Sequence, residues 1–194
     1  MSERYGSAIT EALFMVSRDG VNFKRWNEAF IRPGIERDGT WNYGQLFVAW
    51  TPVETKSTLD DSLTELSFYA TEGYWSAPYS SLRRYTLRLD GFVSLSAPMS
   101  GGELVTKPIV FSGKELSLNF ASSAAGGLKV EIQDDAGGPI DGFSENEGDE
   151  LFGDTTDRIV SWNGKTDVSS LAGKPVRLRF ILRDADVYSF QFRE

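Results

Sequence analysis

Glu72 is the residue of this sequence that best fits acid–base chemistry. It lies in the segment Thr71-Glu72-Gly73-Tyr74-Trp75, directly after an apolar run that alternates as a β-strand does. A carboxyl group beside Trp75 would be partly desolvated, and desolvation raises the pKa of a carboxyl group, as a general acid requires. The alternative is a solvated loop glutamate. No second carboxylate is visible at a matching position, so Glu72 is a catalytic candidate without an evident partner.

Aromatic residues in the first part of the chain form a second candidate site. Aromatic residues make up 13% of the chain, and four of the five tryptophans lie within the first 75 residues. Aromatic rings can bind the C–H faces of sugar rings, since they bury a large apolar area. The candidates, which lie among Gly, Asn, Ser and Pro, are Trp41, Tyr43, Tyr74, Trp75 and Tyr79. The alternative is that these rings pack on their own sheet. Trp50, inside an apolar run, is instead expected in the core.

Acidic side chains cluster between residues 130 and 157, where neither lysine nor arginine occurs. Clustered loop oxygens suit a hard cation such as Ca²⁺, although the spacing matches no EF-hand loop. The residues expected to hold a structural calcium ion, if one is present, are Asp134, Asp135, Asp154 and Asp157. A solvated acidic loop is the alternative, and no other cofactor is expected.

Composition excludes several further chemistries and partners. The chain has no histidine and no cysteine, which rules out Ser-His-Asp triads, Cys-His pairs, disulfides and histidine or thiolate metal sites. Its net charge of -8 would repel a polyanion, so nucleic acid is not an expected partner. No apolar run reaches the length of a signal peptide or a membrane span. We therefore expect a soluble chain with no membrane partner, while its localisation stays open.

Alternating apolar segments in the first half predict β-strands. The strands are expected at Ala12–Ser17, Val21–Trp26, Leu46–Trp50, Leu63–Ala70 and Arg84–Leu89. Asp19-Gly20 supplies the turn of a hairpin between the first two. The run Leu46–Trp50 fits a strand buried on both faces. Together these segments predict roughly one four-stranded sheet, and a helix over residues 59–68 is the second interpretation.

The second half predicts a sandwich. Beyond Asp90-Gly91, apolar alternating segments of five to seven residues recur between Gly-rich turns. This spacing is typical of two antiparallel sheets packed face to face. A helical turn is expected only at Asp167–Leu171, where Asp167 can cap it and Gly173 can end it. The fold prediction is therefore all-β, with a sheet region over residues 1–84 and a jelly-roll-like β-sandwich over residues 85–194.

Several short sequence segments between residues 82 and 192 occur in an order that resembles that of a known protein family. They include Tyr85–Leu95, Thr106-Lys107-Pro108, Gly142-Phe143-Ser144, Val160-Ser161-Trp162 and Leu171–Phe180. Together they resemble the C-terminal end of glycosidase-like five-bladed β-propeller proteins of the invertase and arabinanase kind. The spacing of Ser17, Asp19, Gly20 and Trp26 also resembles the outer hairpin of a propeller blade. The resemblance implies a partial propeller-like antiparallel sheet followed by a β-sandwich.

The resemblance also implies a function and its limits. In that family the propeller holds its catalytic carboxylates in a central funnel, on opposite sides of a glycosidic bond. This chain is too short for five blades, and it has Trp41-Asn42 where related blades often carry Trp-Asp. An amide cannot accept the proton that a base must take. We therefore expect a carbohydrate-binding or accessory module, with a saccharide ligand and no complete catalytic site. The alternatives are a glycoside hydrolase acting on a plant or microbial polysaccharide, and a structural module that forms a homo-oligomer through an exposed sheet edge.

Overall fold

The computed structural model describes residues 9–35, 41, 46–58, 63–74 and 80–194. The chain divides into two compact units, Met1–Arg88 and Leu89–Glu194, called here the N-terminal and C-terminal units. All strand pairs are antiparallel and the described residues contain no α-helix, which confirms the all-β prediction. The boundary expected after Arg84 falls within a strand. No helix in this described part is long and apolar enough to cross a membrane.

The N-terminal unit begins with the predicted hairpin. Its strands are β1 (Ala12–Val16) and β2 (Lys24–Ile31). The turn is longer than a two-residue loop, and the carboxylate of Asp19 organises it by accepting hydrogen bonds from Ser17 and from the backbone N–H of Asn22. Gly20 supplies the positive φ of 73°. Hydrogen bonds from the side chain and then the backbone of Asn22 hold the pKa of Asp19 far below its usual value.

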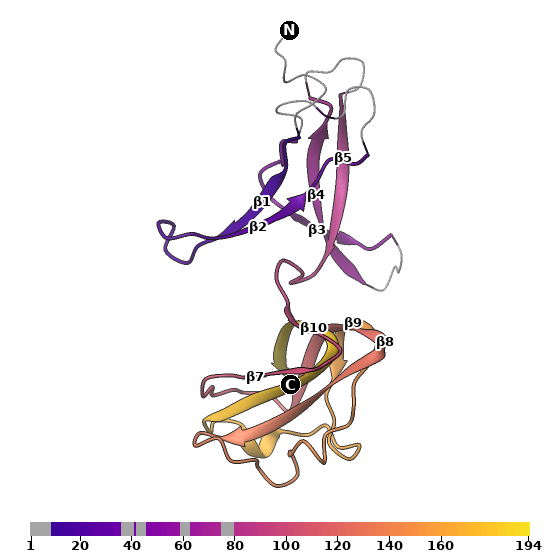
Figure 1. The fold of residues 1–194 in the computed structure, drawn as a ribbon. Coiled ribbons are helices and arrows are strands. Elements are labelled where there is room, and N and C mark those ends of the chain that lie inside the picture. Colours follow the sequence, from indigo (N-terminus) through magenta and orange to yellow (C-terminus); the bar gives the residue numbers. More distant parts are fainter. Residues whose placement is uncertain (1–8, 36–40, 42–45, 59–62, 75–79) are drawn as a thin grey trace. The chain divides into compact units, whose positions relative to one another are not determined.

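A second sheet completes the N-terminal unit (Figure 1). Its order is β3 (Val53–Lys56), β4 (Thr64–Glu72) and β5 (Ser81–Arg88). Residues 64–68, which the helical interpretation included, therefore belong to a strand. Phe68 of β4 is buried, and the ring of Phe30 in β2 lies edge-on to it with centroids 5.7 Å apart. This aromatic contact joins the two sheets.

The segment Leu46–Trp50 is not the fully buried strand that its apolar run predicted. Val48 pairs with β4 only through an isolated bridge, and regular pairing resumes at Val53, after Pro52, which has no N–H to donate. Between these two pairs the edge strand holds four residues where β4 holds two, so it bulges outward. Trp50 lies in this bulge and is fully exposed, at 102%. The expectation that Trp50 belongs to the core is wrong.

Two long strands build the C-terminal unit. They are β8 (Glu115–Asp134), of 20 residues, and β10 (Val176–Arg193), of 18 residues. Shorter strands flank them: β6 (Leu95–Ala97) and β7 (Gly102–Val105) pair with β10, and β9 (Asp154–Ile159) pairs with β8. The prediction of five- to seven-residue strands in two separate sheets is wrong in this respect, because these five strands form one hydrogen-bonded sheet.

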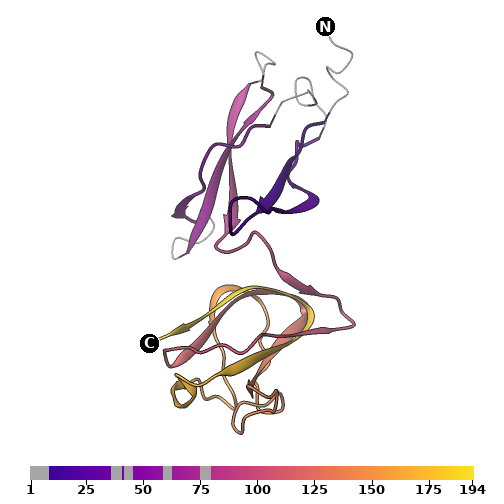
Figure 2. The same cartoon turned by 90° about the vertical axis from the view of Figure 1, so that its left-hand side faces the viewer.

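This sheet nevertheless makes a sandwich, because it folds over on itself (Figures 1 and 2). The two ends of β8 contribute fully buried side chains to a single apolar cluster. They are Leu116, Leu118 and Phe120 from one end, and Leu128, Val130 and Ile132 from the other. Trp162 completes the core, and its indole N–H donates a 2.8 Å hydrogen bond to the carbonyl of Val130. The two halves of one ribbon therefore act as the two layers.

The fold-over point requires a glycine on β8. A Cβ atom at Gly126 would lie 2.6 Å from the carbonyl oxygen of Arg183 and closer still to that of Asp184. Asp184 adopts a left-handed backbone conformation with φ of 43°, and the pairing register shifts between Arg183 and Ala185. The backbones of β8 and β10 thus approach too closely here for any side chain on the glycine.

The predicted helical turn is present as a short 3₁₀ helix, η1 (Ser169–Leu171). The carboxylate of Asp167 accepts a 2.8 Å hydrogen bond from the backbone N–H of Ser169. Gly173 follows the turn with a φ of 75°. Gly173 thus follows the turn as predicted, whereas Asp167 lies one residue before the N-cap position, which Val168 occupies without a side-chain capping bond.

Gly126→Ala is expected to destabilise the C-terminal unit by about 3 kcal/mol, because the added methyl group meets backbone atoms that cannot rotate away. Urea unfolding followed by tryptophan fluorescence measures the loss. Gly34→Ala is the matched control, since a Cβ atom there meets nothing within 4 Å. Equal stability of the Gly126→Ala protein and the wild type would contradict the account of the bend.

Candidate functional site

Glu72, the catalytic candidate, lies at the C-terminal end of β4. Its Oε1 accepts hydrogen bonds from Nε of Arg83, at 2.7 Å, and from the hydroxyl of Tyr85, at 2.9 Å. The β4–β5 register places all three side chains on the same face of the sheet. Burial, and then the hydrogen bond to Glu72, raises the pKa of Tyr85 to about 12. The carboxylate of Glu72 is therefore an acceptor in a local network.

The other acid of β4 does not complement Glu72. Glu65 is seven positions earlier on the strand, so it points to the opposite face of the sheet. Its Oε1 lies 2.8 Å from Nη2 of Arg84, and this guanidinium also donates to the hydroxyls of Ser67 and Thr55. Glycosidic bond hydrolysis needs two carboxyl groups that face one bond from both sides. The two acids of this strand do not provide that geometry.

The predicted aromatic residues are only partly within the described structure. Tyr43, Trp75 and Tyr79 lie outside the described residues. Trp41 is half-buried, and its indole N–H donates to the carbonyl of Gly34 at 3.2 Å. Tyr74 is 38% exposed. Of the described candidates, Tyr74 therefore offers the more accessible ring.

Tyr74 has an aromatic neighbour that the sequence did not single out. Its ring lies edge-on to that of Phe47, with centroids 5.1 Å apart. Phe47 faces Thr71 across the ladder, since its carbonyl accepts from the N–H of Thr71 and its own N–H donates to the Thr71 hydroxyl. Tyr69, two positions before Thr71, points to the same side of β4.

Phe47, Tyr69 and Tyr74 form what we call the aromatic face of the N-terminal unit. Their exposed fractions are 52%, 37% and 38%, so all three rings are open to solvent. Arg84 lies opposite Tyr69 in the β4–β5 register and therefore shares this face. The face thus combines flat apolar rings with the hydroxyl of Thr71 and a guanidinium group. The signal that could have found Tyr69 is the alternation of β4, which turns it away from buried Phe68 and Ala70.

Two of the four aspartates proposed for calcium, Asp134 and Asp157, accept other hydrogen bonds. Asp134 accepts hydrogen bonds from the N–H groups of Ala136 and Gly138 and so holds a turn. Asp157 accepts from Nη1 of Arg193 at 2.9 Å. Asp135 and Asp154 are the other two residues proposed as calcium ligands. Among the described residues, no group of three or more acidic side chains is arranged to hold a metal ion. The geometry therefore gives the calcium hypothesis no support.

An arginine side chain organises a cluster of acidic side chains in the C-terminal unit. Arg179 of β10 lies 2.6 Å from Glu103, 3.1 Å from Glu145 and 3.4 Å from Glu131. Glu131 is 5% exposed, and it also accepts from Gln133 and from the N–H of Glu145. Burial by itself raises the pKa of Glu131, but these hydrogen bonds and Arg179 outweigh it, so the net pKa is lowered.

Sequence reasoning missed this network because its members come from four distant segments. The pairing of β8 with β10 places Arg179 directly opposite Glu131. A buried carboxylate next to a guanidinium stabilises a fold only while both are charged. The network is thus a structural feature whose strength depends on pH.

Comparisons with protein-family models, with curated proteins and with solved structures find no match to this chain. The resemblance to propeller glycosidases therefore stays a prediction.

The C-terminal unit is expected to lose stability in acid through Glu131. Its pKa is lower in the folded chain than the ordinary value of 4.5, so its contribution is complete above that pH and is lost as the pH falls below it. Glu131→Gln is expected to reduce the decrease of the unfolding free energy between about pH 7 and about pH 3, as measured by urea unfolding.

Glu150→Gln is the control, since it removes a 3.4 Å surface ion pair to Arg183 in which both side chains are more than half exposed. The Glu150→Gln protein should keep the wild-type dependence of the unfolding free energy on pH. If the Glu131→Gln protein also kept this dependence, Glu131 would not be the group responsible for the loss of stability in acid.

Proposed function

We propose that this chain binds saccharides without cleaving them, through the aromatic face of the N-terminal unit. The observation that carries the proposal is the exposure of Phe47, Tyr69 and Tyr74 on one side of a sheet. Removing large aromatic rings from water lowers the free energy. Three exposed rings on one face therefore favour a ligand with an apolar surface.

The polar groups around these rings favour a saccharide over a purely apolar partner. A sugar ring presents C–H groups on its faces and hydroxyl groups around its edge. The rings of Phe47 and Tyr74 suit the C–H groups, while Thr71 and Arg84 supply hydrogen-bonding groups on the same side. Arg84 is already fixed by Ser67, so little side-chain entropy is lost when it binds.

The placement of the two acids on β4 supports the proposal of binding without hydrolysis. Glu72 and Glu65 point to opposite faces and each lies against an arginine, Arg83 and Arg84 respectively. Neither arrangement supports an acid and a base acting on one glycosidic bond. An accessory role beside a separate catalytic protein or domain fits these features.

Phe47→Ala and Tyr74→Ala are each expected to weaken saccharide binding about tenfold, the effect of losing roughly 1.4 kcal/mol of stacking. Affinity gel electrophoresis against arabinan, inulin, levan and xylan identifies the ligand, and isothermal titration calorimetry then measures the affinities. Phe23→Ala is the matched control, because Phe23 is 54% exposed but lies in the β1–β2 turn.

Three results would contradict the proposal. The first is that none of the polysaccharides retards the wild type. The second is that the Phe47→Ala, Tyr74→Ala double variant binds as well as the wild type. The third is release of reducing ends from a polysaccharide by the purified chain, abolished by Glu72→Gln, which would establish the glycosidase alternative.

Strand β1 supports a second candidate role, self-association through a sheet edge. Its sheet has two strands among the described residues, and such hairpins are marginally stable alone. Leu13, Met15 and Val16 are 42%, 50% and 44% exposed. Pairing of β1 with a second copy would cover these side chains and bond its open backbone groups.

If β1 mediates self-association, the wild type should sediment as a dimer and Met15→Lys as a monomer, because a lysine ammonium group opposes burial in the new interface. Sedimentation equilibrium measures both masses. Val21→Lys, at a 79% exposed position of the hairpin turn, should keep the wild-type mass. A wild type that is monomeric at every concentration would exclude this role.

A further inference from the structure

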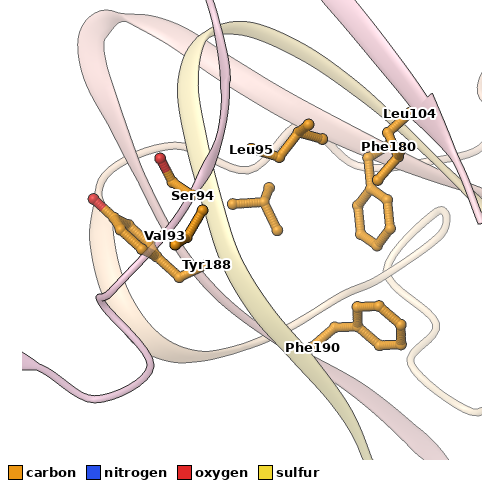
Figure 3. Close-up of a pocket in the computed structure, with 8 residues that line it drawn as sticks. Val93, Ser94, Leu95, Leu104, Phe180, Tyr188 and Phe190 are labelled. Atoms are coloured by element: carbon orange, nitrogen blue, oxygen red, sulfur yellow. The ribbon is translucent and has the colours of Figure 1, made fainter. Parts of the chain in front are cut away.

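The C-terminal unit contains a pocket of about 320 Å³ beside β10 (Figure 3). Its walls come from β6, β7, β10 and the segment that leads into β6. In the view of Figure 3, Phe180 and Phe190 lie on one side, and Val93, Ser94 and Tyr188 lie on the other. This volume falls at the lower end of the range of small-molecule sites.

The strand register shows that the pocket is continuous with the hydrophobic core. Leu104 of β7 is opposite Phe180, and Leu95 of β6 is opposite Val187, so all four point to the inner side of the folded sheet. Phe180 is 1% exposed, whereas Leu104 is 40% exposed and Leu95 is 37% exposed. The inner side is thus filled at its centre and open between the two short edge strands.

A β-bulge in β10 shapes this opening. Val187 pairs with Phe120 and Ser189 pairs with Asn119, so Tyr188 is an extra residue in the ladder. The extra residue reverses the alternation beyond it and turns Phe190 inward, opposite Leu118 in the core. Bulges of this kind commonly redirect side chains next to binding sites.

The chemistry of the walls selects a neutral apolar occupant. No charged side chain lines the pocket among the described residues. The nearest acid on the strand, Asp186, accepts a 2.6 Å hydrogen bond from Ser94, which holds the rim of the pocket. A charged ligand would lose its hydration without gaining a counter-charge. An engineered cavity of about 150 Å³ is large enough for benzene, so this pocket suits a molecule of roughly two aromatic rings.

We propose that this pocket is a second ligand site, which binds a neutral apolar molecule of about two aromatic rings or an aliphatic group of similar volume. Its lining residues belong to the C-terminal unit, whereas the aromatic face belongs to the N-terminal unit, and the proposal goes beyond saccharide binding. The walls are the inner surface of a sandwich, so the ligand extends the core instead of covering an outer surface.

The test uses the full chain and N-phenyl-1-naphthylamine, a neutral probe whose fluorescence rises in apolar surroundings. The wild type is expected to bind it saturably with one site per chain. Leu104→Gln, which places an amide in the wall, and Val93→Trp, which fills the space, should each weaken binding about tenfold. Val110→Gln is the control, because Val110 is 65% exposed and does not line the pocket.

Each outcome of this experiment either supports or overturns the proposal. Saturable binding that both pocket variants weaken and Val110→Gln preserves supports the proposal, provided that thermal melting shows the variants folded. If Leu104→Gln does not fold, Val93→Trp and the wild-type stoichiometry decide alone. Absence of saturable binding by the wild type, or equal affinity in wild type and Val93→Trp, would overturn it.

Discussion

The close approach of β8 and β10 at Gly126 is the constraint on which the C-terminal unit depends. At this point the β10 carbonyls leave no room for a side chain, and Asp184 adopts a left-handed backbone conformation. The bend brings the two ends of one ribbon face to face, so Leu118 and Val130 share a single core. Without it, each half of the ribbon would expose an apolar face to water.

The same bend explains where the unit leaves space. Edge strands β6 and β7 follow the two arms of the bent β10, and the core opens between them to form the pocket. On the outer side of the ribbon, polar side chains replace apolar ones, and Arg179 neutralises part of the charge of Glu131. The fold thus separates an apolar inner surface from a charge network that depends on pH.

Local signals in the sequence predicted local structure well. Asp19-Gly20 gave the hairpin turn, Asp167 gave the helical turn, and alternation gave the all-β class. The long strands were not predicted, because the small and polar residues of Ala121–Gly127 resemble a loop although they continue β8 through its bend. Trp50 was misplaced because an apolar run does not reveal a bulge in an edge strand.

The candidate sites could be predicted only in part. Glu72 and Tyr74 were identified from their segment, but Phe47 joins Tyr74 only through strand pairing. Arg179 likewise meets Glu131 only through the register of β8 with β10, which composition does not encode. Register depends on the whole core, since a slip of one residue reverses every side chain of a strand.

Native-state hydrogen exchange tests the folded ribbon most directly. If one core holds both halves together, the ladder amides at the two ends of β8 will exchange with the same opening free energy and the same urea dependence. Exchange of one end at markedly lower free energy than the other would show two independent sheets and contradict the account.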